Sequence, residues 1–185
     1  MATLFDTPTH SVPGASKFGL RLFLASLTMF FGASMVGYLV LRFTAPSWPP
    51  PGWPGLPPIL WASSALILAT SASLVLAVRS ARRRGPEHGR TPLLVALALS
   101  FGFLVCQLLA WRQMMAAGLP PQDSLVAWAF YLLTFLHGLH VVGGLVPLIW
   151  TTAKNAPTLS GIELVAEYFH YLDVVWLVLF FGLWL

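Results

Sequence analysis

The sequence predicts an all-α membrane protein, a polytopic bundle of five transmembrane helices. Of its 185 residues, 57% are hydrophobic and only 9% are charged, whereas soluble domains carry roughly a quarter charged residues. The mean hydropathy is +0.78, and a helix needs about 20 apolar residues to cross a bilayer. Five apolar runs reach that length. These observations exclude a separate soluble domain, so we expect one membrane domain over residues 1–185.

The length of the five runs identifies them as helices. Strands of a membrane barrel need only about 10 residues, and an open backbone cannot satisfy its hydrogen bonds in lipid. The stretch before the first run lacks the apolar core of a signal peptide, so we interpret it as a short solvated leader. The predicted spans are 18–41, 58–78, 92–111, 124–150 and 163–185.

Proline, glycine and charge separate the runs. Seven of the fifteen prolines lie between positions 45 and 58, which excludes a helix there. Residues 79–90 contain five arginines and predict a charged loop. Gly118 with two following prolines ends the third run, and residues 155–157 separate the last two.

The basic residues predict the orientation of the chain. With the N-terminus on the inner side, eight of the ten lysines and arginines lie on that side. Only Arg42 and Arg112 lie on the outer side. Because inner loops of membrane proteins are enriched in basic residues, we expect a cytoplasmic N-terminus and an external C-terminus. The arginine run is then explained by topology.

Ionisable side chains within the spans are costly and require an explanation. On the fourth span His137 and His140 lie about 60° apart around the helix. The fifth span carries four more ionisable groups, three of them on one face. Since a short loop makes these two helices antiparallel neighbours, we expect a polar intramembrane cluster. Its candidate members are His137, His140, Glu163, Glu167, His170 and Asp173.

Three interpretations of this cluster stay open. Glu167 and His170 fit the E-x-x-H pattern of di-iron bundles, and a membrane oxygenase or desaturase site with His137 and His140 is one reading. However, a ferritin-type site needs two such motifs and the chain has one; an axial histidine pair for haem is equally weak. The cluster is otherwise a structural network between helices or a proton relay.

A few other residues are candidates for minor roles. Arg42 and Trp48, at the outer end, and His170 are candidate lipid contacts. The serines of the second span, among them Ser64 and Ser71, are expected to bond their own helix. The single Cys106 permits neither an intrachain disulfide nor a thiolate metal cluster. No nucleotide or nucleic-acid motif is present.

Two long motifs resemble subunit III of the haem-copper oxidases. Residues 130–144, FYLLTFLHGLHVVGG, are similar to that family's F-Y-x-L-T-x-x-H-G-x-H-V-x-x-G signature. Residues 161–176, GIELVAEYFHYLDVVW, are similar to G-x-E-x-x-x-x-Y-W-H-F-x-D-x-V-W in its last helix. Weaker similarities at 17–26, 48–52 and 107–119 follow in the same order, so the resemblance covers nearly the whole chain.

The resemblance implies an accessory subunit without a catalytic centre or metal of its own. It implies the short bacterial form with five helices, in the inner membrane, with a periplasmic C-terminus. The implied partners are oxidase subunits I and II, which hold haem and copper, together with membrane phospholipid. The implied role is to stabilise a proton-translocating cytochrome c or quinol oxidase of aerobic respiration, bind lipids and support proton uptake. Alternatives are the related accessory protein of nitric oxide reductase and a stand-alone membrane metalloenzyme.

The chain departs from the family pattern at three informative positions. Leu27 stands where relatives carry a glutamate after Ser26, so any role of that acid does not transfer. Arg21 occupies a position that is commonly apolar, and Glu167 is an extra acid. We hypothesise that Glu167 pairs with Arg21 near the inner interface or partly substitutes for the lost acid.

Overall fold

A computed structural model describes residues 14–48, 52–122, 124–154 and 157–184. Within these ranges the chain forms five long helices and no strand. All five are long and apolar enough to span a membrane, which confirms the predicted fold class. The helices are α1 (Ala15–Thr44), α2 (Ile59–Arg84), α3 (Arg90–Ala116), α4 (Leu125–Ala153) and α5 (Leu159–Trp184).

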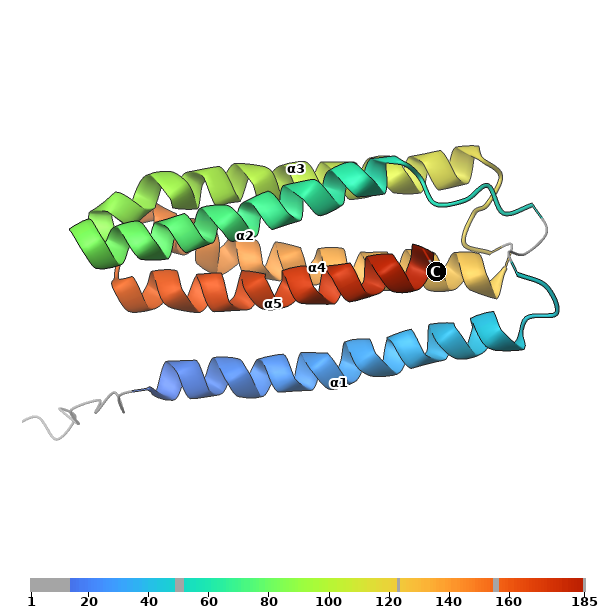
Figure 1. Ribbon diagram of the computed structural model, residues 1–185, viewed down its shortest axis with the longest axis horizontal. Helices are drawn as coiled ribbons and strands as arrows, with labels where there is room; N and C mark the ends of the chain where they lie inside the picture. The colour runs from blue at the N-terminus through green and yellow to red at the C-terminus, as the bar shows by residue number, and fades with distance from the viewer. Residues whose placement is uncertain (1–13, 49–51, 123, 155–156, 185) are drawn as a thin grey trace, which may run out of the picture.

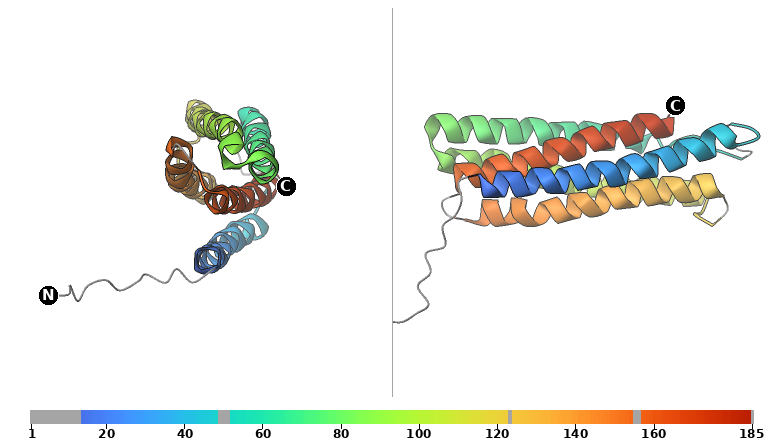
Figure 2. Two further views of the ribbon diagram at one scale, coloured as in Figure 1. Left: turned by 90° about the vertical axis from the view of Figure 1, so that its left-hand side faces the viewer. Right: turned by 90° about the horizontal axis from the view of Figure 1, so that it is seen from below.

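The helices run alongside one another in an elongated bundle (Figure 1). α2 and α3 form a tight antiparallel pair that packs on α5 and α4. Seen end-on, α2 to α5 surround a common core, and α1 lies outside them against α4 and α5 (Figure 2). The largest fully buried side chains include Trp176, Phe103 and Phe130, so aromatic packing fills the centre of this core.

The helix ends have identifiable local causes. The Ser124 side chain accepts a hydrogen bond from the Ala127 amide at 3.0 Å and caps α4. Gly85 and Gly118 follow α2 and α3 with φ angles of 107° and 81°. Glycine adopts such positive φ values without the steric cost that other residues meet. These two glycines therefore allow the chain to leave α2 and α3 just before the prolines that follow them.

The helices extend beyond most of the predicted spans, and one loop prediction is wrong. Residues 79–84 were expected in a charged loop but continue α2, and a 3-10 turn (Pro86–Gly89) leads directly into α3. Arginine favours helix, and its long side chain reaches water from the end of a span. The predicted break at 45–58 is confirmed for its described residues. Positions 49–51 and 155–156, and the predicted leader up to residue 13, lie outside the described ranges.

The start of α1, the α2–α3 turn and the α4–α5 connection all lie at one end of the bundle (Figure 1). This end carries most of the basic residues, and we call it the basic end. Its described basic residues are Lys17, Arg21, Arg79, Arg82, Arg83, Arg84, Arg90 and Lys154.

Candidate functional site

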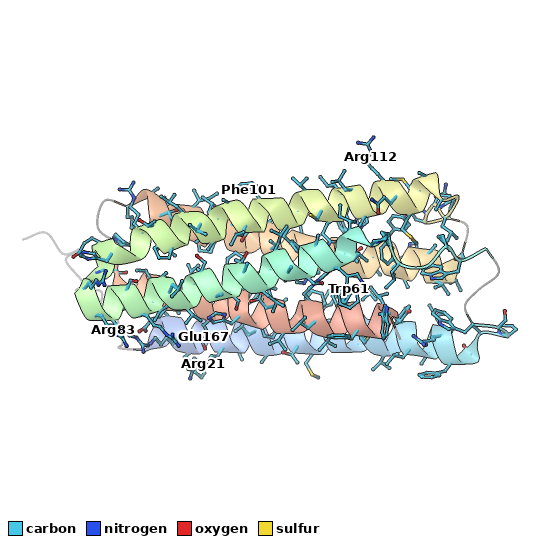
Figure 3. The ribbon with its side chains drawn as sticks, turned by 45° about the horizontal axis from the view of Figure 1, so that its top comes forward. Arg21, Trp61, Arg83, Phe101, Arg112 and Glu167 are labelled. Carbon is cyan, nitrogen blue, oxygen red and sulfur yellow. The ribbon has the colours of Figure 1, made fainter. Side chains whose placement is uncertain are left out.

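Ion pairs link three helices at the basic end. The Glu163 carboxylate on α5 accepts from Lys17 Nζ on α1 at 2.7 Å and from Arg82 Nη2 on α2 at 2.9 Å. One turn further, Arg21 Nε donates to Glu167 Oε1 at 2.9 Å. Figure 3 shows the Arg21 and Glu167 side chains close together. The hypothesised pairing of Arg21 with Glu167 is therefore present in the structure.

A polar cavity of about 520 Å³ lies among these ion pairs, between α1, α2 and α5. The Glu163 side chain is only 18% exposed, whereas those of Arg21 and Arg82 are 69% and 62% exposed. The carboxylates thus lie against the helices, and the cations reach outward. Exposed ion pairs contribute little to stability. Glu163 is less exposed than Glu167 and binds two cations, so it holds α1 more strongly than Glu167 does.

His170 also lines this cavity and connects it to the interior of the helix bundle. Its Nδ1 atom forms a short hydrogen bond with the Ser71 hydroxyl of α2. The Asp173 carboxyl, one turn further along α5, is only 4% exposed. Neither carboxyl oxygen has a hydrogen bond of normal geometry with a described residue. Burying a carboxyl without such a partner is costly. We therefore infer that Asp173 has a structural or functional role at the α2–α5 contact.

Further hydrogen bonds join α2 to α5 and to α3 toward the opposite end of the bundle. The indole Nε1 of Trp176 donates to Ser64 Oγ at 2.9 Å. Gln107 Nε2 of α3 donates to Ser63 Oγ at 3.3 Å. Both serine hydroxyls also donate to the Leu60 carbonyl. These serines therefore bond their own helix, as expected, and they also accept hydrogen bonds from neighbouring helices.

The two histidines of α4 both pack against the Phe31 ring but differ in burial and hydrogen bonding. His137 is fully buried among the rings of Phe31, Phe103 and Trp176, and no described residue bonds either of its ring nitrogens. His140 is half-buried, and its Nδ1 lies 2.6 Å from the Leu136 carbonyl of its own helix. The two rings therefore do not share a ligand or a hydrogen bond.

The structure does not bring the six predicted polar residues into one cluster. Glu163 and Glu167 are held by cations at the basic end, and His170 meets Ser71. Asp173 is buried without a hydrogen-bond partner among the described residues, and His137 and His140 lie on α4. Helix periodicity placed Glu163, Glu167 and His170 on one face of α5, but their partners come from α1 and α2. Within the described ranges no three His, Cys, Asp or Glu side chains are placed to hold a metal ion.

The candidate lipid contacts are divided between the two ends. The guanidinium of Arg42 lies over the Trp48 ring, 4.8 Å from its centroid, and Tyr38 packs edge-on against the same ring. His170 lines the cavity near the basic end instead. These three residues therefore cannot form one lipid site.

Apolar hollows flank α1 on both sides. One of about 460 Å³ lies between α1, α4 and α5 and is lined by Phe23, Pro147 and Tyr168 among others. Another of about 380 Å³ follows the α1–α5 contact from Thr28 to Leu179. Between them, Thr28 and Tyr171 share a hydrogen bond of 3.1 Å. α1 is thus held by a few contacts separated by hollows large enough for hydrocarbon chains.

Comparison with known proteins decides the family. The family model described as cytochrome c oxidase subunit III matches residues 2–185. The chain belongs to this family. It is similar to cytochrome c oxidase subunit 3 of Synechocystis sp., with 31% identity over 179 residues, 92% of this chain and 76% of that protein.

Other members of the subunit III family match over more of their length. The probable cytochrome c oxidase subunit 3 of Mycobacterium tuberculosis is 28% identical over 187 residues, 96% of this chain and 92% of its own. The subunit 3 of Thermostichus vulcanus is 28% identical over 178 residues, covering 92% and 87%. The recognition from the two motifs is confirmed, and with five helices able to span a membrane this subunit III is a multi-pass membrane protein.

Sequence reasoning missed the partners of the acidic residues of this subunit III. Lys17 and Arg82 were counted only as topology signals, yet both bind Glu163. Ser71 was assigned to its own helix, yet it bonds His170. The spacing of these residues within one helix carries no signal for these contacts. Only the joint departure of Arg21 and Glu167 from the family pattern indicated a pair in advance.

Proposed function

We propose that this chain is an accessory, non-catalytic subunit of a haem-copper terminal oxidase of the cytochrome c oxidase type. The observation that carries the proposal is the match of the family model to residues 2–185. Several polar side chains of the described residues support it, because they join helices: Glu163 joins α5 to α1 and α2, and Trp176 joins α5 to α2. Such contacts fit a scaffold whose role is to stabilise a larger assembly.

In this proposal the haem and copper belong to oxidase subunits I and II, and this subunit packs beside subunit I in a bacterial inner membrane. The basic end faces the cytoplasm, because basic residues concentrate on the inner side of membrane proteins. The C-terminus is then periplasmic. The assembly transfers electrons to oxygen and translocates protons, and this chain supports proton uptake by subunit I without a reaction of its own.

Lipid binding is the second part of the proposed role. The apolar hollows on either side of α1 have volumes of about 460 and 380 Å³ and lie at membrane depth. Lipid chains that fill them would complete the packing of α1, because unfilled apolar space forfeits dispersion contacts. This supports a subunit whose outer helix is stabilised by bound phospholipid.

Deletion of this subunit tests the accessory role. We expect the remaining oxidase, purified without this chain, to keep its haem spectrum and reduce oxygen while its thermal stability falls. Reintroducing the wild-type chain should restore the stability. An oxidase that loses its haem or all oxygen reduction at once would show that the chain takes part in the reaction centre, which contradicts the proposal.

A further inference from the structure

The hollow of about 460 Å³ between α1, α4 and α5 is lined by polar as well as apolar groups. His140 and Gly143 of α4 and Tyr168 of α5 line it, and Figure 2 shows α1 alongside both of these helices. Two of its apolar residues, Phe23 and Leu139, are 48% and 52% exposed. The hollow is therefore open at the side, and a molecule dissolved in the hydrocarbon of the membrane can enter it.

The first unused hydrogen-bond acceptor of this hollow belongs to His140. Its Nδ1 lies 2.6 Å from the Leu136 carbonyl, and because a carbonyl can only accept, Nδ1 carries the proton. A charged imidazole is costly at membrane depth, and a neutral one has a single N–H. Nε2 therefore has a free lone pair. Unlike the ring nitrogens of His137, it is not enclosed by protein.

The second unused acceptor is the Gly143 carbonyl. Pro147 lies inside α4 and lines the same hollow, and proline has no N–H for the carbonyl four residues earlier. No side chain of the described residues donates to the Gly143 carbonyl instead. The nearby Tyr168 hydroxyl donates to the His140 carbonyl at 2.9 Å. Around His140 and Gly143 the hollow thus offers lone pairs, and its N–H and O–H groups are already used.

The depth of these acceptors indicates an uncharged ligand. His140 lies 15 residues after Leu125 and 13 before Ala153, the two ends of α4, so it is near the middle of the membrane. A phospholipid keeps its headgroup at the surface, roughly 15 Å away across one leaflet. Acceptors without a partner are costly in hydrocarbon. The position therefore favours a ligand that dissolves in the membrane core and donates hydrogen bonds.

We propose that this hollow binds an isoprenoid quinol, the reduced form of a membrane quinone, whose hydroxyl groups donate to His140 Nε2 and to the Gly143 carbonyl. The rings of Phe23 and Tyr168, with centroids 6.4 Å apart, form an aromatic wall for the quinol ring. The isoprenoid tail leaves through the open side. The oxidised quinone has carbonyls in place of the hydroxyls, so it cannot satisfy either acceptor.

This binding goes beyond the proposed lipid role, because hydrogen bonds and not hydrocarbon contacts select the ligand. In the proposed function the redox centres belong to other subunits. The quinol is therefore held here and not oxidised, and no bond of the ligand is made or broken. The hollow of about 380 Å³ between α1 and α5 stays available to lipid chains.

The test is binding of decylubiquinol to the oxidase complex purified through a tag on this chain and stripped of lipid in detergent. Cyanide and the exclusion of oxygen keep the quinol reduced. Native mass spectrometry counts the quinol retained, with decylubiquinone and decanol as comparison ligands. We expect the quinol to bind roughly tenfold more tightly than the quinone, which leaves the acceptors unpaired. Equal binding of the quinone would overturn recognition by donors, and equal binding of decanol would overturn a quinol as the ligand.

Pro147→Ala is the sharpest variant of this chain. Alanine restores an N–H for the Gly143 carbonyl, so the quinol loses one acceptor and its affinity should fall roughly fivefold, the factor for one neutral hydrogen bond. The bundle should unfold no more easily, since alanine favours the interior of a helix and proline disfavours it. Weaker binding with undiminished stability excludes a general structural lesion. An unchanged quinol affinity would overturn the site at Gly143.

His140→Leu removes the other acceptor and should also weaken quinol binding roughly fivefold. Val146→Ala is the matched control, because Val146 is next to Pro147 but is 68% exposed and does not line the hollow. It should change the affinity by less than about twofold. Equal losses in the two variants would overturn the site. A quinol bound to another subunit would respond to neither. Absence of haem subunits from the preparation would refute the proposed function instead, while the titration would still test the hollow of this chain.

Discussion

The Arg21–Glu167 ion pair allows a quantitative test of how α1 is held. The pair has one nitrogen–oxygen contact of 2.9 Å, and its side chains are 69% and 32% exposed. Solvent screens a pair this open, so we expect a coupling free energy of about 0.5 kcal/mol and no more than about 1 kcal/mol. The Lys17–Glu163 pair, with a carboxylate only 18% exposed, should couple more strongly.

A double-mutant cycle measures this coupling directly. Arg21→Gln, Glu167→Gln and the double variant would be unfolded by denaturant in micelles without anionic lipid, and their free energies of unfolding compared. The charge reversal Arg21→Glu with Glu167→Arg should recover part of the loss. Arg83→Gln combined with Glu167→Gln is the control and should be additive. Additive losses in the Arg21 cycle, or a reversal worse than both single changes, would refute the reasoning.

Three further predictions concern contacts within the bundle. In Gly144→Ala the new Cβ would lie 2.6 Å from a ring carbon of Tyr168, so the free energy of unfolding should fall by about 1–3 kcal/mol. Gly143→Ala is the control, because its Cβ would lie 3.9 Å from the Tyr168 hydroxyl, and it should be neutral or stabilising. Equal effects of the two variants would argue against the α4–α5 contact. Ser64→Ala leaves the buried Trp176 indole without its acceptor and should lower the free energy of unfolding by about 1–3 kcal/mol. Ser100→Ala loses only a bond to its own helix and should lower it by less. Denaturant titration of both variants measures the difference. His170→Leu breaks the contact with Ser71, so the subunit should dissociate from the oxidase more readily in detergent while haem absorbance and oxygen reduction persist, and immediate haem loss would contradict a structural role.

The number and order of the helices could be predicted because hydropathy acts on whole spans. Every predicted span corresponds to one helix. The ends were less accurate, most clearly at residues 79–84, where α2 continues through four arginines. Hydropathy reports where a helix leaves the hydrocarbon, whereas helix propensity and the glycine at position 85 determine where it ends. The end of the predicted span and the end of the helix therefore differ by the length of helix that lies in the headgroup layer.

The candidate site was harder to predict because its contacts join different helices. Helix periodicity correctly placed Glu163, Glu167 and His170 on one face of α5. It could not show that their partners are Lys17, Arg21 and Ser71, since packing between α1, α2 and α5 decides this. His137 and His140 form no hydrogen bond or ion pair with these residues in the described part of the chain.

The most direct test of the central claim is purification of the complex in mild detergent through a tag on this chain. The visible spectrum and the identity of the co-purifying proteins would be recorded together, with haem quantified per chain. We expect haem absorbance, with oxidase subunits I and II present in a fixed ratio to this subunit. A chain that purifies alone and binds iron stoichiometrically would contradict it and favour a membrane metalloenzyme.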